Sequence, residues 1–260
     1  MREHALFISH PLNLRYFSPR RFTRVYFGNE FCDRLLPTKD QLLQVLNFCH
    51  KNALAFAFVT PYCTNLTIKK VEPLLDLLPS KTEVVLNDFG LLESIKYKNL
   101  VPVLGRLLVS VSRDPRIPLR RQNYDFYFKA NNLHLPFLNF LQSLGIRRVE
   151  LDNIKQGYDI PPMKKISLSL YYPFVCSSVT RRCIFANLGR TSAFFKVITR
   201  CRQECWGKIL KVKISGHRES LYVMGNAQYY INLDKSVLRE HRFDRLVYMP
   251  VFPNNSFHGK

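Results

Sequence analysis

Short runs of β-branched and aromatic residues alternate with helical hydrophobic patterns through the first two thirds of the chain. A run of consecutive apolar residues suits a strand that is buried on both faces, and apolar residues spaced three or four apart suit a helix packed on one side. The predicted strands are 23–27, 54–59, 83–87, 101–104, 148–151 and 165–172, and the predicted helices contain 42–49, 71–78 and 91–95. Such β-α repetition is typical of parallel strands joined by right-handed crossovers. We therefore expect a TIM-barrel-like parallel β/α barrel, either complete or with strands missing.

Two segments depart from this alternation. The segment at about 107–133 contains several Pro and Arg residues and is too long for an ordinary barrel connection, so we predict a basic loop over the site. Short strand-like runs at 221–224 and 227–231 predict a small C-terminal β appendage. The length fits one domain over residues 1–260, with a cysteine-rich segment at 176–205.

The hydrophobic pattern contains no run of about 18 uncharged apolar residues, and the start of the chain mixes His, Arg and Pro. We therefore expect a soluble, cytoplasmic protein without membrane insertion. Seven cysteines are an odd number, in a chain that is too large to need covalent cross-links. Metal binding explains them better than a set of disulfides.

The formal net charge of +20, from 39 basic and 19 acidic residues, predicts a strongly positive surface. The excess is concentrated at Arg20, Arg21 and Arg24, at Arg113, Arg116, Arg120 and Arg121, and within 181–213. Two interpretations stay open. The basic residues either keep the protein in solution or bind RNA, another polyanion or an anionic substrate.

The spacing of the late cysteines indicates a shared ligand site. Cys201 and Cys205 have three residues between them, which places both thiols on one helical turn or at the mouth of one tight loop. Cys183 lies upstream and can supply a third sulfur. The fourth is either Cys176 or Cys32, because residues that follow strands of a parallel barrel meet at the same rim.

Four thiolates hold either tetrahedral zinc or an iron–sulfur cluster. One isolated ligand and a scattered trio are less typical of structural zinc, which uses two close pairs. The alternative is that these are free buried cysteines that act as small hydrophobic residues. That interpretation suits Cys49, on the apolar face of a predicted helix, and Cys63, in a predicted turn.

Several short motifs occur in a fixed order along the chain. They are Tyr-Phe-Gly-Asn-Glu-Phe-Cys at 26–32, Glu-Val-Val-Leu-Asn-Asp-Phe-Gly-Leu-Leu at 83–92, Leu-Gly-Arg-Leu-Leu at 104–108, Tyr-Pro-Phe-Val-Cys at 172–176, and Arg182 with Cys183. In this order they resemble the collagenase-like peptidase family of unknown catalytic type, over roughly residues 23–230. Within that family the pattern is similar to the UbiU/UbiV-like iron–sulfur branch, and nearest to UbiV.

This resemblance implies a [4Fe-4S] cluster bound by Cys32, Cys183, Cys201 and Cys205, with zinc as the alternative metal. A sister pattern in the family uses a close cysteine pair, which makes Cys176 the alternate ligand. The gap between Cys183 and Cys201 is longer than the UbiV pattern has. The family likeness further implies an oxygen-independent hydroxylation or related redox step, and a heterodimer with a related family member.

Three further residues are candidates for positioning a substrate beside the cluster. Asn87 and Asp88 follow the third predicted strand, and Arg106 follows the fourth, so all three are expected at the same rim as the cysteines. The alternative is that Asn87 and Asp88 form a turn and that Arg106 is a surface residue.

The sequence leaves two alternative functions open. Relatives that modify RNA, together with the basic charge and the aromatic residues among it, make an RNA-modifying or RNA-binding protein the first alternative. A peptidase is the second. The sequence contains no His-Glu-x-x-His helix and no Gly-x-Ser-x-Gly turn, and its seven histidines show no metal-ligand spacing.

Overall fold

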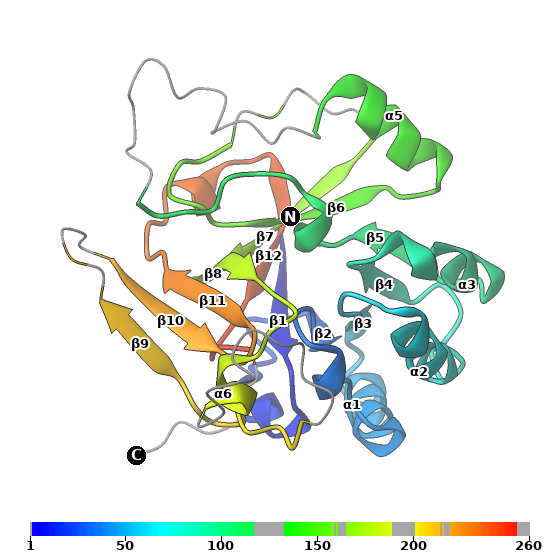
Figure 1. Cartoon of the computed structure of the whole chain (residues 1–260). Helices are drawn as coiled ribbons and strands as arrows, with labels where there is room; N and C mark the ends of the chain where they lie inside the picture. The colour runs from blue at the N-terminus through cyan, green and yellow to red at the C-terminus, as the bar shows by residue number, and fades with distance from the viewer. Residues whose placement is uncertain are drawn as a thin grey trace.

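The computed structural model describes residues 2–116, 133–158, 160, 165–188, 201–213, 215 and 219–253. Their core is a closed barrel of parallel strands in the order β1-β12-β7-β6-β5-β4-β3-β2 (Figure 1). The barrel strands are β1 (Glu3–Ile8), β2 (Arg24–Gly28), β3 (Ala55–Val59), β4 (Glu83–Leu86), β5 (Val101–Leu104), β6 (Arg148–Asp152), β7 (Ser167–Tyr172) and β12 (Phe243–Tyr248). The predicted TIM-barrel-like fold is confirmed, and its ring of strands is complete.

Helices cover the outside of the barrel. The α-helices are α1 (Lys39–Lys51), α2 (Asn65–Leu75), α3 (Leu92–Tyr97), α5 (Leu135–Ser143) and α6 (Ile184–Asn187); the 3-10 helices are η1 (Pro11–Tyr16), η2 (Asp33–Leu35), η3 (Phe89–Leu91), η4 (Arg106–Leu108) and η5 (Val237–Arg239). Helix α1 begins at a capping box in which Thr38 and Gln41 exchange side-chain and backbone hydrogen bonds. Its buried residues Leu42, Val45 and Cys49 share one face. This face packs on the outside of the strands.

A second sheet lies beside the barrel (Figure 1). It is antiparallel, with the order β8-β11-β10-β9. Its strands are β8 (Phe174–Val179), β9 (Leu210–Lys213), β10 (Ser220–Met224) and β11 (Ala227–Ile231). The predicted small β unit is therefore present. The structure refines its place, because the chain afterwards returns to the barrel through β12, so the unit is an insertion between β7 and β12.

Two barrel strands were not predicted from the sequence. These are β1 and β12, which pair with each other and close the ring. Since β1 precedes the run at 23–27, Cys32 follows the second barrel strand and not the first. Asn87 and Arg106 likewise follow the fourth and fifth strands. Helix α2 also begins earlier than expected, at Asn65.

Alternate residues of each strand belong to two different clusters of buried side chains. Leu6 and Val25 belong to the cluster between strands and helices, while Phe7 and Tyr26 belong to a second cluster inside the ring. The inner cluster continues into the inserted sheet, where Tyr229 is one of its members. The insertion therefore packs against the interior of the barrel.

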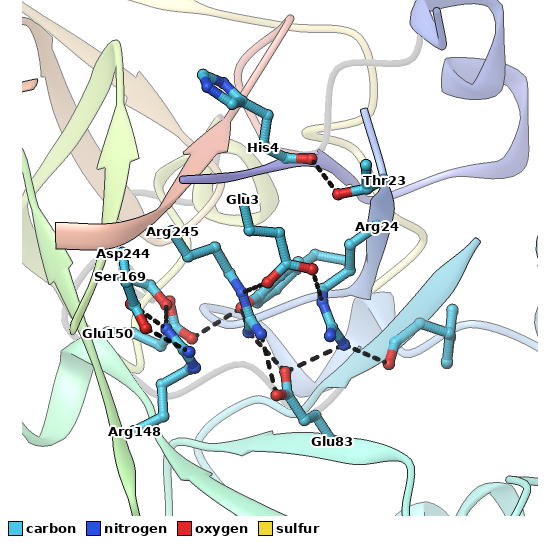
Figure 2. A network of polar contacts seen from close by, with 12 residues as sticks. Glu3, His4, Thr23, Arg24, Glu83, Arg148, Glu150, Ser169, Asp244 and Arg245 are labelled. Atoms are coloured by element: carbon cyan, nitrogen blue, oxygen red, sulfur yellow. Dashed lines mark hydrogen bonds and ion pairs between the residues drawn. The ribbon is translucent and has the colours of Figure 1, made fainter. Parts of the chain in front are cut away.

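The amino end of the barrel interior is charged (Figure 2). Arg245 donates to Glu83 at 2.6 Å and 3.1 Å and to Glu3 at 2.5 Å, and Arg24 joins the same two carboxylates. Tyr26 links Arg245 to Glu150, which lies at the centre of β6. These contacts hold the first residues of several strands together.

Some sequence predictions fall outside the described residues. Most of the predicted basic loop lies at 117–132, and part of the cysteine-rich segment lies at 189–200. None of the helices in the described ranges has the length and apolar character needed to cross a membrane.

Candidate functional site

A pocket of about 770 Å³ lies where loops after the barrel strands meet the inserted segment. The thiols of Cys32, which follows β2, and Cys63, which follows β3, line it from the barrel side. Cys183, Cys201 and Cys205 line it from the insertion. The remaining lining residues are Phe31, Asp33, Arg34, Leu35, Tyr62, Thr64, Asn65, Leu66, Thr67, Lys70, Thr180, Arg181 and Asn226.

The position of Cys32 is set by the turn after β2. The side-chain oxygen of Asn29 accepts hydrogen bonds from the backbone N–H groups of Phe31 at 3.1 Å and Cys32 at 2.9 Å. Gly28, which ends β2, has a φ of 146° and lies against the backbone of Val59, where a side chain would collide. The chain can therefore turn sharply and present Cys32 to the pocket.

Hydrogen bonds tie the insertion to the same turn. Asn226 donates to the carbonyl groups of Phe31 and Thr180, and so joins the β10–β11 hairpin to the loop that carries Cys32. Gln203 donates to the carbonyl of Arg34 at 3.1 Å. These bonds bring Cys201, Cys205 and Cys183 toward the barrel.

A ring contact also fixes the segment that contains Cys205. The indole of Trp206 packs edge-on against His10, with 5.2 Å between ring centroids. Since His10 follows β1, the insertion is held by loops from both β1 and β2.

The thiols are close enough to influence each other's ionisation. A hydrogen bond from the Cys205 thiol lowers the pKa of Cys183 to about 6, and the same bond together with burial raises the pKa of Cys205. The pKa of Cys32 is raised to about 12, mainly by burial, and negative charge on Cys201 or Cys183 contributes to this rise. Cys183 is thus the first of these thiols to ionise, and a cation would be needed to hold all of them as thiolates.

The thiols gather around the pocket without forming a closed set of metal ligands. Within the described ranges, no three or more His, Cys, Asp or Glu side chains are arranged to hold a metal ion. The donor set nevertheless fits a soft metal or a cluster, because sulfur is the donor atom that zinc and iron–sulfur sites share. A metal at this pocket would have to draw the thiols toward a common centre.

Cys176, the alternate ligand, lies away from the pocket lining. It is 2% exposed on β8, where its backbone N–H faces Asp152 at 3.5 Å and its thiol faces the carbonyl of Ser178 at 3.6 Å. Burial raises its pKa to about 12. The geometry favours Cys32 over Cys176 as the fourth thiol.

Cys63 is a pocket residue that the sequence analysis set aside. Its thiol donates to the carbonyl of Pro61 at 3.3 Å, and burial raises its pKa to about 12. Its place in the sequence could have predicted this, because Cys63 follows β3 much as Cys32 follows β2, and residues that follow parallel strands meet at one rim.

Asn87 and Asp88 organise the loops beneath the pocket but do not line it. Asn87 is buried and donates to the carbonyl of Thr60 at 2.8 Å, while its oxygen accepts from the N–H of Leu107 at 3.3 Å. Asp88 accepts from the N–H groups of Gly90 at 2.8 Å and Cys63 at 3.2 Å. Their contacts agree with the turn-forming alternative, and a role in positioning substrate stays a prediction.

Arg106 is fully buried, so the alternative of a surface arginine is wrong. It forms ion pairs with Glu30 at 2.5 Å and with Asp152 at 2.6 Å, and its guanidinium lies 4.2 Å from the ring centre of Tyr171. Arg106 is not among the residues that line the pocket. Direct contact with a substrate in this pocket would require these buried pairs to open, and substrate positioning stays a prediction.

Comparison with known proteins gives fold likeness and nothing finer. No family model matches the chain, and no curated protein matches it. Among solved structures, the U32 peptidase Mk0906 is 12% identical with a TM-score of 0.48, covering 96% of this chain and 93% of its own. The copper homeostasis protein CutC from Streptococcus agalactiae is 14% identical with a TM-score of 0.43, covering 66% of this chain and 88% of its own.

A class V chitinase from Nicotiana tobaccum is more distant still, at 7% identity with a TM-score of 0.30, over 95% of this chain and 93% of its own. At these values none of the likenesses carries an argument about activity. The structure itself defines the class of protein, a parallel β/α barrel with an inserted antiparallel sheet. Its distinguishing feature is a group of cysteines that line a pocket at the carboxyl end of the strands.

Proposed function

We propose that this chain is an iron–sulfur protein of the collagenase-like peptidase family, in which Cys32, Cys183, Cys201 and Cys205 bind a [4Fe-4S] cluster. One observation carries the proposal: these four cysteines, from three separate parts of the chain, line one pocket together with a fifth, Cys63. Buried thiols that merely fill a core have no reason to gather at a pocket lined by polar groups. Soft metal binding explains both their number and their place.

The cluster, when bound, supplies electron transfer for an oxygen-independent hydroxylation or a related redox step, as the family resemblance implies. The residues of the chain provide the surroundings. The Asn29 turn orients the Cys32 segment, and Asn226 holds the insertion against that segment. Cys63 and Tyr62 extend the wall beside the thiols, where a substrate would lie.

The pocket lining favours an anionic ligand. Among the described residues of the lining, Arg34, Lys70 and Arg181 are basic and Asp33 is the one carboxylate. Lys70 and Arg181 have no ion-pair partner in the part of the chain that the structure describes. This excess of positive charge would attract an anion and balance the charge of a thiolate-bound cluster.

An RNA-modifying or RNA-binding role is the second candidate, and the same basic lining together with the net charge of +20 supports it. A salt-titrated binding assay with single-stranded RNA separates it from a small anionic substrate. Phosphate contacts would make the affinity fall steeply with salt, and absence of binding at low salt would remove this candidate.

A peptidase is less well supported. Cys183 has a lowered pKa, as a nucleophile would, but the lining residues that the structure describes include no histidine to act as its base. Heterodimer formation with a related protein is implied by the family resemblance and stays a prediction.

The test is anaerobic reconstitution with ferrous iron and sulfide. We expect a broad absorption shoulder near roughly 400 nm from thiolate-to-iron charge transfer. Replacing Cys32 by Ser should lower the iron content as much as replacing Cys205 by Ser, because each thiol is one of the four ligands.

The Cys49→Ser variant is the matched control, since Cys49 is a buried thiol on helix α1 and should leave the iron content unchanged. Colourless protein with stoichiometric zinc would overturn the assignment of the cluster. Full iron in the Cys32 variant together with loss in a Cys176→Ser variant would assign the fourth ligand to Cys176.

A further inference from the structure

The carboxyl end of the barrel contains a buried group of four charged residues just behind the thiol pocket. Arg106 and Arg113 face Glu30 and Asp152, so two positive charges balance two negative charges. Arg106, Glu30 and Asp152 are completely buried, and the side chain of Arg113 is 14% exposed. We refer to these residues as the inner quartet.

Arg106 is the centre of the inner quartet. Its Nε lies 3.1 Å from both oxygens of Glu30, its Nη2 lies 2.5 Å from Glu30 Oε2, and its Nη1 lies 2.6 Å from Asp152. The planar guanidinium therefore grips Glu30 with two nitrogens and Asp152 with a third. A lysine has one nitrogen and could not hold both carboxylates in this way.

The inner quartet is coupled to Cys32 through a very short stretch of backbone. Glu30 is followed by Phe31 and Cys32, and the Phe31 ring lies 5.2 Å from the guanidinium of Arg106 and 5.3 Å from the ring of Tyr229. Both ends of this stretch are thus fixed: Glu30 by Arg106, and the N–H of Cys32 by Asn29.

We propose that Arg106 is a positioning residue for the thiol of Cys32, acting through Glu30 and the Phe31 ring. The inference deepens the proposed function, and it rests on that function for the role of Cys32 as a ligand. The claim that Arg106 holds Cys32 in place does not depend on the proposed function. Arg106 never touches the metal or the substrate in this role.

The competing explanation is that the inner quartet only stabilises the fold. Arg245 offers a matched comparison, because it is also a buried arginine, 2% exposed, that joins two carboxylates, Glu3 and Glu83. It lies in the charged network at the amino end of the barrel (Figure 2), and it is not among the residues that line the pocket. Loss of Arg106 leaves the buried Glu30 unpaired, and loss of Arg245 leaves Glu3 and Glu83 with Arg24 as their remaining partner. Either loss should destabilise the fold. Only loss of Arg106 should release Cys32.

The experiment measures alkylation of each cysteine separately, in metal-free, reduced full-length protein treated with limiting iodoacetamide and analysed by peptide mass spectrometry. Alkylation requires access to the thiol, so a released Cys32 should react faster. In Arg106→Met we expect about a tenfold faster reaction of Cys32, which corresponds to a tenfold more populated open state. Cys49 should react at its original rate.

Three variants complete the comparison. Arg245→Met should leave the alkylation rate of Cys32 within about twofold of that in the original protein, even if its melting temperature falls as far as that of Arg106→Met. Arg106→Lys should restore part of the protection, since one carboxylate can still be paired. Glu30→Gln keeps the shape of the side chain and should raise the rate of Cys32 in the same direction, which preserves the test if Arg106→Met does not fold.

Equal Cys32 rates in the original protein, Arg106→Met and Glu30→Gln would overturn the proposal, as would equal acceleration by Arg245→Met. Reconstitution with iron and sulfide separates this inference from the proposed function. Accelerated Cys32 alkylation in a protein that never binds iron would refute the cluster and leave the positioning role standing. Normal iron binding together with unchanged Cys32 alkylation in Arg106→Met would support the cluster and refute the positioning role of Arg106.

Discussion

Glu150 is a carboxyl group at the centre of a barrel strand, completely shielded from water. One of its oxygens accepts from Tyr26 at 3.0 Å, and the other has no hydrogen-bond partner. The charges of Arg245 and Arg148 favour its ionisation, but Arg245 is already paired with Glu3 and Glu83, and Arg148 with Asp244. Burial therefore raises the pKa of Glu150 to about 7, against the opposing effect of Arg245.

This shift predicts a dependence of stability on pH. The folded-state pKa of about 7 is above the ordinary value of 4.5, so the folded protein binds a proton that the unfolded chain releases. The stabilisation is fully present below about pH 4.5 and is lost as the pH rises through 7. Relative to Glu150→Gln, the free energy of unfolding should fall by about 3 kcal/mol across that window.

Urea unfolding of both proteins at a series of pH values measures this difference. Glu93→Gln is the control, because Glu93 is exposed on α3 and should give a profile parallel to that of the original protein. Parallel profiles for Glu150→Gln as well would show that folding does not shift the pKa of Glu150.

At the scale of single elements, the end of β2 depends on a glycine. Gly28 has a φ of 146° and lies so close to the backbone of Val59 that a methyl group has no room. Gly28→Ala should therefore lower the free energy of unfolding by more than about 3 kcal/mol, because both the backbone conformation and the packing are lost.

Gly157→Ala separates the two contributions. Gly157 also has a positive φ, of 72°, but nothing lies within 4 Å of a methyl group built there. It should cost only about 1 kcal/mol, the price of the backbone conformation. Chemical denaturation of both variants checks the comparison, and equal losses would show that the close approach of β2 to β3 is unimportant.

A charged interior residue in a short apolar run helps to explain why β1 and β12 were not predicted. Strand β3 is apolar on both faces, and β4 is apolar after its first residue, Glu83, so a continuous hydrophobic run revealed both. Strand β1 begins with Glu3, and β12 has Arg245 near its centre, and both charges point into the ring. A charged residue in a short run is typical of an exposed segment, and only the three-dimensional network supplies its partner.

The same reasoning explains what could be predicted of the site. The gathering of Cys32 with Cys183, Cys201 and Cys205 could be anticipated because residues after parallel strands meet at one rim. The burial of Arg106 could not, since its two carboxylates come from distant parts of the sequence. The role of these thiols as cluster ligands stays a prediction.

At the scale of the whole molecule, barrel closure depends on β12. It pairs with β1 on one side and β7 on the other, so its removal would leave two open strand edges. A chain ending at Glu240 should lose cooperative unfolding altogether, whereas a chain ending at Pro253 retains every described strand and should keep it. Thermal unfolding followed by circular dichroism distinguishes them. A sharp transition in the shorter chain would show that the ring is not needed.

The pairing of β1 with β12 also sets the order of events during synthesis on the ribosome. All the thiols of the pocket emerge before β12 does, while β1 still lacks the neighbour that completes the ring. A newly made chain therefore exposes its cysteines to solvent and oxidants before the barrel has closed. If the thiols bind a metal, as proposed, they would bind it best after β12 has left the ribosome and the ring has closed.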